Sequence, residues 1–131
     1  MYALKLKIDG QIELIEMPKD PHYTWYPSQI GCEWMEIVRP INSPYTLVID
    51  EEGLLKEEHF INPHASVMYG FLKHRQPIVG EALLLIEKPS PEGPELTGFT
   101  KEEALCIKDG LDTQTEAVFR QIAATISDEG D

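Results

Sequence analysis

Apolar and polar residues alternate in two short stretches near the N-terminus, YALKLKI (residues 2–8) and QIELIEM (residues 11–17). A period of two places alternate side chains on the same face of a β-strand. Asp9 and Gly10 lie between the stretches, and this dipeptide readily adopts the positive φ of a two-residue turn. The pattern predicts a β-hairpin with strands at about 2–8 and 11–17.

Three further stretches are typical of strands because they are rich in β-branched, aromatic and other apolar residues. The first two, at about 34–39 and 45–50, are separated by a segment with Pro40 and Pro44, and they predict a second antiparallel pair. The third, PIVGEALLLIE (residues 77–87), is apolar on both faces, as in a central strand.

The segment that starts at Asn62 has the signals of a helix. Asn62 is a favoured N-cap residue, Pro63 suits the first helical position, and basic residues follow at the far end. The expected buried stripe consists of Val67, Met68, Phe71 and Leu72. A short helical turn is also expected near residues 27–30, within a loop rich in prolines and aromatics.

The last part of the chain has a different composition. KPSPEGPELTG (residues 88–98) contains three prolines and two glycines and is typical of a linker. Beyond it, two sequences of capping-box form, one from Thr100 and one from Thr113, predict two short helices near 101–109 and 113–126. An apolar stripe on the second helix is expected to pack on the main domain or, alternatively, to form a dimer contact. It contains Val118, Phe119, Ile122, Ala123 and Ile126.

These elements together predict an α+β fold. We expect a small, mostly antiparallel sheet of about five strands with one or two packed helices, followed by a C-terminal helical pair. The expected organisation is an α+β domain at 1–88, a Pro/Gly linker at 89–99 and a helical extension with an acidic tail at 100–131.

Charge narrows the classes of partner. The 131-residue chain has a net charge of −12, and its acidity is concentrated toward the C-terminus. Phosphate backbones are bound through Lys and Arg, so direct binding to nucleic acid is not expected.

The longest apolar run, residues 82–86, is far shorter than the roughly 20 residues of a membrane span. The N-terminus also lacks the pattern of a signal peptide, so we expect a cytoplasmic protein without membrane contact.

No familiar catalytic or metal-binding motif is found in the sequence. The four histidines have neither zinc-type spacing nor a nearby cysteine, so no metal, cofactor or catalytic residue is assigned. VIDEEGLL sets Asp50, Glu51 and Glu52 beside Gly53, and we interpret it as a strand end that turns where glycine allows a positive φ. Leu54 and Leu55 are expected to anchor the next segment to the core.

One basic cluster stands out against the acidic background, formed by Lys73, His74 and Arg75. The C-terminal end of a helix favours cations even without a ligand, because of the helix dipole. As the functional alternative, Lys73 and Arg75 together with Arg39 are expected to hold a phosphate group.

Further contacts to such a ligand are expected from aromatic and polar side chains. Trp25 or Tyr26 would stack on a base, although both rings also suit a loop that packs on the core. Polar contacts would come from Asn62, Ser66 and Tyr69.

Four segments in order, IGCEWMEIVRP, LVIDEEGLL, INPHASVMYG and PIVGEALLL, also resemble a known family. This is a small domain family of bacteriophages and integrated mobile elements, particularly of Gram-positive hosts, catalogued as a domain of unknown function. The similarity covers about residues 2–88, and residues 89–131 have no counterpart in it.

The resemblance implies a counter-defence accessory protein in the cytoplasm of a bacterial host. Our main hypothesis is a non-enzymatic homo-oligomer that sequesters a nucleotide-derived small molecule. One alternative is an acidic inhibitor of a host defence or nucleic-acid-binding protein, and the other is a cyclic-nucleotide hydrolase in which Asp50 and Glu51 meet the histidines. The acidic surface of the inhibitor would include Glu92, Glu95, Glu102, Glu103, Asp109 and Asp112.

Overall fold

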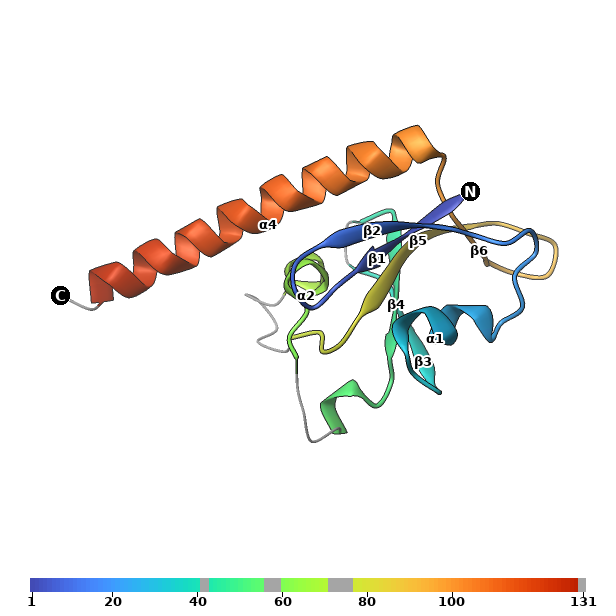
Figure 1. Ribbon diagram of the computed structural model, residues 1–131, viewed down its shortest axis with the longest axis horizontal. Coiled ribbons are helices and arrows are strands. Elements are labelled where there is room, and N and C mark those ends of the chain that lie inside the picture. The colour runs from blue at the N-terminus through green and yellow to red at the C-terminus, as the bar shows by residue number, and fades with distance from the viewer. Residues whose placement is uncertain (41–42, 56–59, 71–76, 130–131) are drawn as a thin grey trace.

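A six-stranded antiparallel sheet forms the centre of the computed structural model, with helices on both of its faces (Figure 1). The structure describes residues 1–40, 43–55, 60–70 and 77–129. Short helices and one long C-terminal helix complete the fold. The predicted α+β class is therefore confirmed.

The element bounds follow the sequence pattern closely in the first half of the chain. The strands are β1 (Tyr2–Leu6), β2 (Ile12–Glu16), β3 (Met35–Val38), β4 (Tyr45–Asp50), β5 (Ala82–Lys88) and β6 (Glu95–Thr97). The helices are α1 (Trp25–Ile30), the 3-10 turn η1 (Gly53–Leu55), α2 (Pro63–Tyr69) and α4 (Lys101–Glu129).

The strand order is β2-β1-β5-β4-β3, which makes β5 central and β3 an edge strand. Residues 82–84 of β5 pair with β1, and residues 86–88 pair with β6. The predicted hairpin, the second antiparallel pair and the central strand are thus confirmed. The segment predicted as a linker contains β6, because β5 extends beyond its pairing with β1 and leaves an edge that Glu95–Thr97 can fill.

The sheet buries apolar side chains on both faces, because alternate residues of a strand point in opposite directions. One face, covered by α2 and α4, includes Leu4, Leu47 and Leu84. The other face is covered by α1, which contributes Tyr26 and Ile30.

The predicted C-terminal helical pair is wrong, since α4 is one continuous helix (Figure 1). Thr100 starts it with the expected capping box, in which its N–H donates to Glu103 Oε1 (2.9 Å). Thr113 is not a second cap, because its hydroxyl donates to the carbonyl of Asp109 within the same helix (3.0 Å). Gly110 lies inside the helix, where a glycine costs about 1 kcal/mol relative to alanine. Burial of Ala104 and Leu111 on the sheet offsets this cost.

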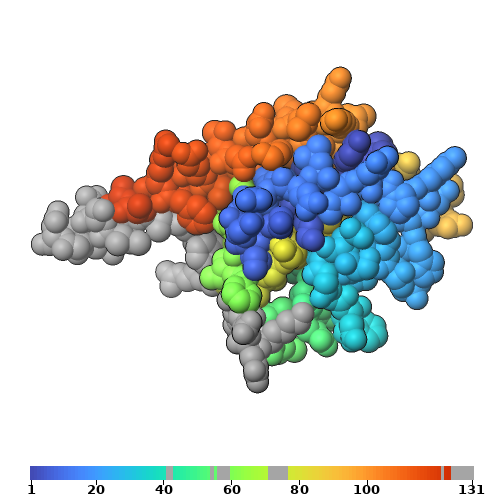
Figure 2. All heavy atoms as spheres, viewed as in Figure 1, coloured from blue at the N-terminus to red at the C-terminus, as the bar shows by residue number. Residues whose placement is uncertain are grey.

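The C-terminal half of α4 reaches past the sheet, and the space-filling view shows α4 lying along one side of the molecule (Figure 2). In this half, Thr115 is buried and Val118 is half-buried, whereas Phe119 and Ala123 are exposed. The side chains of residues 122 and 126 lie outside the described part of the stripe. The described part therefore packs on the main domain only near its start.

Candidate functional site

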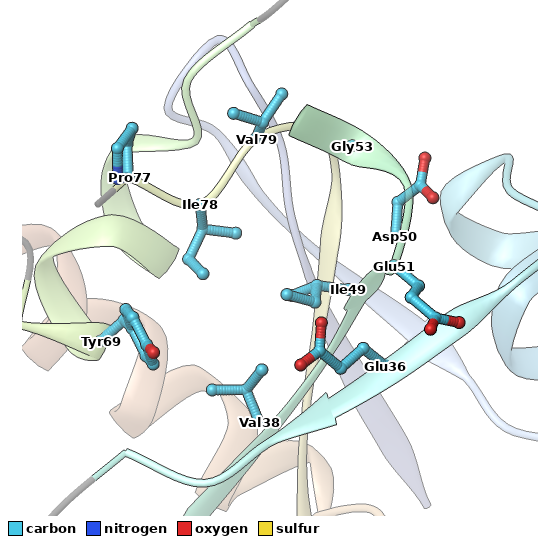
Figure 3. Close-up of a pocket in the computed structure, with 10 residues that line it drawn as sticks. All are labelled: Glu36, Val38, Ile49, Asp50, Glu51, Gly53, Tyr69, Pro77, Ile78 and Val79. Carbon is cyan, nitrogen blue, oxygen red and sulfur yellow. The ribbon is translucent and has the colours of Figure 1, made fainter. Parts of the chain in front are cut away.

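A cavity of about 90 Å³ opens between the edge strand β3 and helix α2 (Figure 3). Its apolar lining includes Val38, Ile49, Tyr69 and Ile78. This volume corresponds to about three water molecules. The cavity therefore suits a side chain or a short methylene chain better than a whole nucleotide.

Carboxylates border this apolar lining. Glu36, Asp50 and Glu51 all line the cavity. In Figure 3 the Glu36 carboxylate points toward the space beside Tyr69 and Ile78, whereas the carboxylates of Asp50 and Glu51 point away from it. Glu36 and Glu51 are exposed and have no ion-pair partner among the described residues. A cation in the cavity would therefore meet the carboxylate of Glu36.

The pairing of β3 with β4 produces this arrangement. Glu36 is opposite Ile49 in the register, so the carboxylate and the apolar side chain share one face of the sheet. β4 ends at Asp50, whose Oδ1 accepts a hydrogen bond from the N–H of Glu52 (2.9 Å) and starts the turn. The carboxylate of Asp50 is thus part of the turn, as the sequence indicated.

Gly53 is needed at this turn for a reason other than the one predicted. Its φ is not positive, but a Cβ added there would lie 3.1 Å from the carbonyl oxygen of Val79. The glycine therefore allows a close approach of two backbone segments. Leu55, predicted to anchor the next segment, is 83% exposed and does not do so; the side chain of residue 54 is outside the described part.

Two of the predicted polar contacts, Asn62 and Ser66, hold the fold together beside the cavity. The buried Asn62 amide donates from Nδ2 to the carbonyls of Leu6 (2.6 Å) and Gly80 (2.9 Å) and caps α2 through Oδ1. The Ser66 hydroxyl is hydrogen-bonded to both the carbonyl and the N–H of Ile78. These bonds fix residue 78 as a wall of the cavity. Of the predicted ligand contacts, Tyr69 lines the cavity itself.

Trp25 and Tyr26 lie on the opposite face of the sheet. Tyr26 is 7% exposed and packs in the core under α1, with Trp25 against the same cluster. Burial, followed by the negative charge of Glu95, raises the pKa of the Tyr26 hydroxyl. The structure therefore does not bring these aromatics together with Asn62, Ser66 and Tyr69, and the packing of both rings fits the core interpretation.

Arg39 is engaged by a carboxylate. Its Nε and Nη2 donate to Glu87 Oε1 (2.5 Å) and Oε2 (3.0 Å), and Glu87 also accepts a hydrogen bond from the hydroxyl of Thr46 (3.1 Å). The hydrogen bond with Glu87 raises the pKa of Arg39, and the bond from Arg39 lowers the pKa of Glu87. Lys73, His74 and Arg75, the remaining predicted cations, lie outside the described residues.

His64 is buried where α2 meets α4, away from the acidic turn. Its Nδ1 lies 2.9 Å from Thr115 Oγ1, and its Nε2 lies 2.8 Å from the carbonyl of Gly10 and 3.3 Å from Asp112 Oδ1. These contacts join both helices to the hairpin turn. The carboxylates of Asp50 and Glu51 therefore do not meet His64, and His22 is hydrogen-bonded to Thr24 in an exposed loop.

Trp34 is a candidate contact that the sequence did not single out. It directly precedes β3 and is 60% exposed, although its carbonyl accepts a hydrogen bond from the N–H of Glu51 (2.9 Å) and extends the strand pair. The sequence signal that could have identified it is a tryptophan next to glutamates at the start of a predicted strand. Exposed tryptophan is a common anchor of protein interfaces.

A second and larger hollow lies on the α1 face. This groove has a volume of about 680 Å³, and its apolar lining includes Tyr26, Met35, Ile37 and Leu96. Met35 and Ile37 come from β3, so the edge strand borders a hollow on each face of the sheet.

Comparison with known proteins finds no match to any protein-family model, curated protein or solved structure. The resemblance to a phage domain family thus stays a hypothesis. Within the described ranges, no helix has the length and apolar character needed to cross a membrane. The same residues contain no group of three or more His, Cys, Asp or Glu side chains placed to hold a metal ion.

Proposed function

We propose that this protein is a non-enzymatic binding protein whose partner is a basic protein. The observation that carries the proposal is the cavity with apolar walls into which the carboxylate of Glu36 points, with Glu51 at its border. The cytoplasm of a bacterial host and a counter-defence role, as implied by the family resemblance, are the proposed setting.

A lysine or arginine side chain matches both parts of this cavity. Its methylene stem buries apolar area against Val38, Ile49 and Ile78, while its charged end reaches the carboxylate of Glu36. The net charge of −12 would also accelerate the encounter with a basic partner. Trp34, whose carbonyl accepts a hydrogen bond from the N–H of Glu51, would add an exposed ring over which a cation can lie.

The acidic surface predicted on the linker and C-terminal helix is partly used within the protein. Glu103 caps α4, and Asp112 contacts Lys108 and His64. Glu92, Glu102 and Asp109 remain exposed. The proposal therefore assigns specific recognition to Glu36, which points into the cavity, and to Glu51 as an exposed carboxylate on its border. The remaining acids have a general electrostatic role.

Capture of a nucleotide, our main hypothesis from the sequence, has less support from the described residues. A phosphate group in the cavity would face the carboxylate of Glu36, and the cationic group of Arg39 is already held by Glu87. Nucleotide capture thus depends on Lys73 and Arg75, which are outside the described residues. For hydrolysis, the described residues supply no group of catalytic side chains at the cavity, because His64 is used between the helices. His59 and His74 lie outside the described residues.

The test compares two classes of ligand on the full chain. Purified basic bacterial DNA-binding proteins and a panel of cyclic and ADP-ribose-type nucleotides are measured by biolayer interferometry and by melting shift. The double variant Glu36→Gln/Glu51→Gln is paired with Glu92→Gln/Glu102→Gln, which changes the net charge equally at remote exposed sites. We expect at least one basic protein to bind, with affinity reduced about tenfold or more only by the first pair.

Equal losses in the two double variants would mean that binding depends only on net charge, and would refute a specific site. A nucleotide that raises the melting temperature and is recovered intact, with no basic protein bound, would support sequestration instead. Recovery of an altered nucleotide would establish a hydrolase.

A further inference from the structure

The edge strand β3 (Met35–Val38) is paired on one side only. Among the described residues it pairs with β4, and no described strand covers its other edge. An edge strand presents backbone N–H and C=O groups that another chain can pair with. β3 is therefore a suitable place for an extended segment to join the sheet.

The side chains of β3 alternate between the two hollows. Glu36 and Val38 line the cavity on the α2 face, and Met35 and Ile37 line the groove on the α1 face. A strand added beside β3 would direct its own side chains alternately to the same two faces. One set would meet the carboxylate of Glu36, and the other would meet Met35 and Ile37 in the groove.

Added strands are recognised in two ways. Main-chain hydrogen bonds supply affinity, and pockets for alternate side chains supply specificity. Here the two hollows differ in chemistry beside β3, since Glu36 faces one and Met35 and Ile37 face the other. The lining of the second hollow also includes the charged residues Lys19, Asp20, Lys88 and Glu95. From this geometry we infer that β3 binds an extended segment of a partner protein in which basic and apolar residues alternate. This inference rests on the proposed function, which supplies the basic partner.

A second copy of the chain fits this edge less well. Antiparallel pairing of β3 with itself would place two Glu36 side chains on the same face of the joined sheet, with no cation from β3 to meet them. Like charges at close cross-strand positions are destabilising. The charge of the edge therefore favours a basic strand from another protein.

The experiment uses a fluorescein-labelled peptide of about seven residues in which lysine and valine alternate. One control peptide has the same composition with the lysines and valines in separate blocks. Two further control peptides carry backbone N-methyl groups at alternate residues. One peptide is methylated along one edge of the extended chain and the second along the opposite edge, so each loses the N–H groups of a single edge. Fluorescence anisotropy with the full chain reports the affinity of each peptide.

We expect the alternating peptide to bind about tenfold or more tightly than the block peptide, and methylation of one edge to abolish binding. Glu36→Lys should weaken binding about tenfold or more, and Trp34→Ala should weaken it as well. Glu102→Lys, the matched charge change on α4, should change it less than about twofold. Circular dichroism melting verifies that each variant is folded.

If the block and N-methylated peptides bind as tightly as the alternating peptide, strand addition is refuted while the basic-partner function stands. The same holds if the basic proteins bind and no peptide does. A dimer in size-exclusion light scattering that Trp34→Ala dissociates would identify a second copy as the occupant and also refute the inference. Absence of binding by both peptides and basic proteins would refute the proposed function with it.

Discussion

His64 on α2 and Thr115 on α4 are joined by a buried hydrogen bond of 2.9 Å between Nδ1 and Oγ1. The two residues are 3% and 5% exposed, so the bond is shielded from water. It fixes the position of α4 near the point where the helix leaves the sheet.

Replacing Thr115 with valine keeps the shape of the side chain and removes the hydroxyl. Nδ1 of the buried imidazole then loses its partner, and we expect the free energy of unfolding to fall by about 1–3 kcal/mol in urea denaturation. Thr113→Val is the matched control, because that hydroxyl bonds within its own helix and is exposed. Similar losses in the two variants would mean that the contact with His64 contributes nothing specific.

Asn62 is expected to be among the most sensitive polar positions. Asn62→Ala removes two hydrogen bonds to buried carbonyls and the cap of α2, each worth about 1 kcal/mol, so a loss of about 3 kcal/mol in unfolding free energy is expected. Thr24→Ala is the control, since Thr24 precedes α1 without a side-chain cap bond. A loss below about 1 kcal/mol for Asn62→Ala would show that water replaces these bonds easily.

Two glycines should respond to alanine in opposite directions. Gly110 lies inside α4 with open space around an added Cβ, so Gly110→Ala should stabilise the protein by about 0.5–1 kcal/mol. At Gly98 an added Cβ would lie 2.5 Å from the carbonyl oxygen of Tyr2, so Gly98→Ala should destabilise by about 1–3 kcal/mol. Thermal melting of both variants checks the signs. Destabilisation by Gly110→Ala would contradict a continuous α4.

The ion pair of Arg39 and Glu87 should make stability depend on acidic pH. The hydrogen bond from Arg39, and then that from Thr46, hold the pKa of Glu87 below its ordinary value of 4.5. The stabilising contribution of the carboxylate is therefore present above the ordinary pKa and is lost as the pH falls through the lower, folded-state value. Glu87→Gln should be less stable than the parent at neutral pH, and this difference should shrink as the pH falls below the ordinary pKa of 4.5 and through the lower, folded-state pKa.

Urea denaturation at several pH values measures this effect, with Glu92→Gln as the exposed control. A constant difference between the parent and Glu87→Gln across the acidic range would show that the ion pair does not stabilise the folded state.

Local sequence signals were sufficient for the hairpin and for the start of α2. Asp9 and Gly10 correctly placed a turn here, and φ of Gly10 is +86°. The two-residue loop was wrong, because Lys7 pairs with Gln11 and three residues lie between them. Asn62 and Pro63 predicted the helix start, and Asn62 does cap the helix. The apolar run in residues 82–86 likewise predicted a central strand, because only a strand buried on both faces keeps so many leucines from water.

The candidate site depended on contacts between residues far apart in the chain. Its pieces come from β3, the end of β4, α2 and residues 77–79, and no local pattern specifies how near these segments lie. For the same reason the sequence did not reveal that Trp25 and Tyr26 lie on the opposite face of the sheet from Asn62 and Ser66. The alternation of apolar residues in a strand predicts two faces, but it does not predict which helix covers each face.

The sequence by itself determined the α+β class, the hairpin, the acidic character and the helix cap of α2, because each depends on a short pattern or on composition. Tertiary structure alone decided that α4 is one helix, because burial of Ala104, Leu111 and Thr115 offsets the helix-breaking tendency of Gly110. It also decided that Arg39 is held by Glu87, and that β3 is an edge strand with Glu36 beside a hollow on one face and Met35 and Ile37 beside a hollow on the other. These are outcomes of packing and pairing across the chain, where free energy depends on neighbours in space and not on neighbours in sequence.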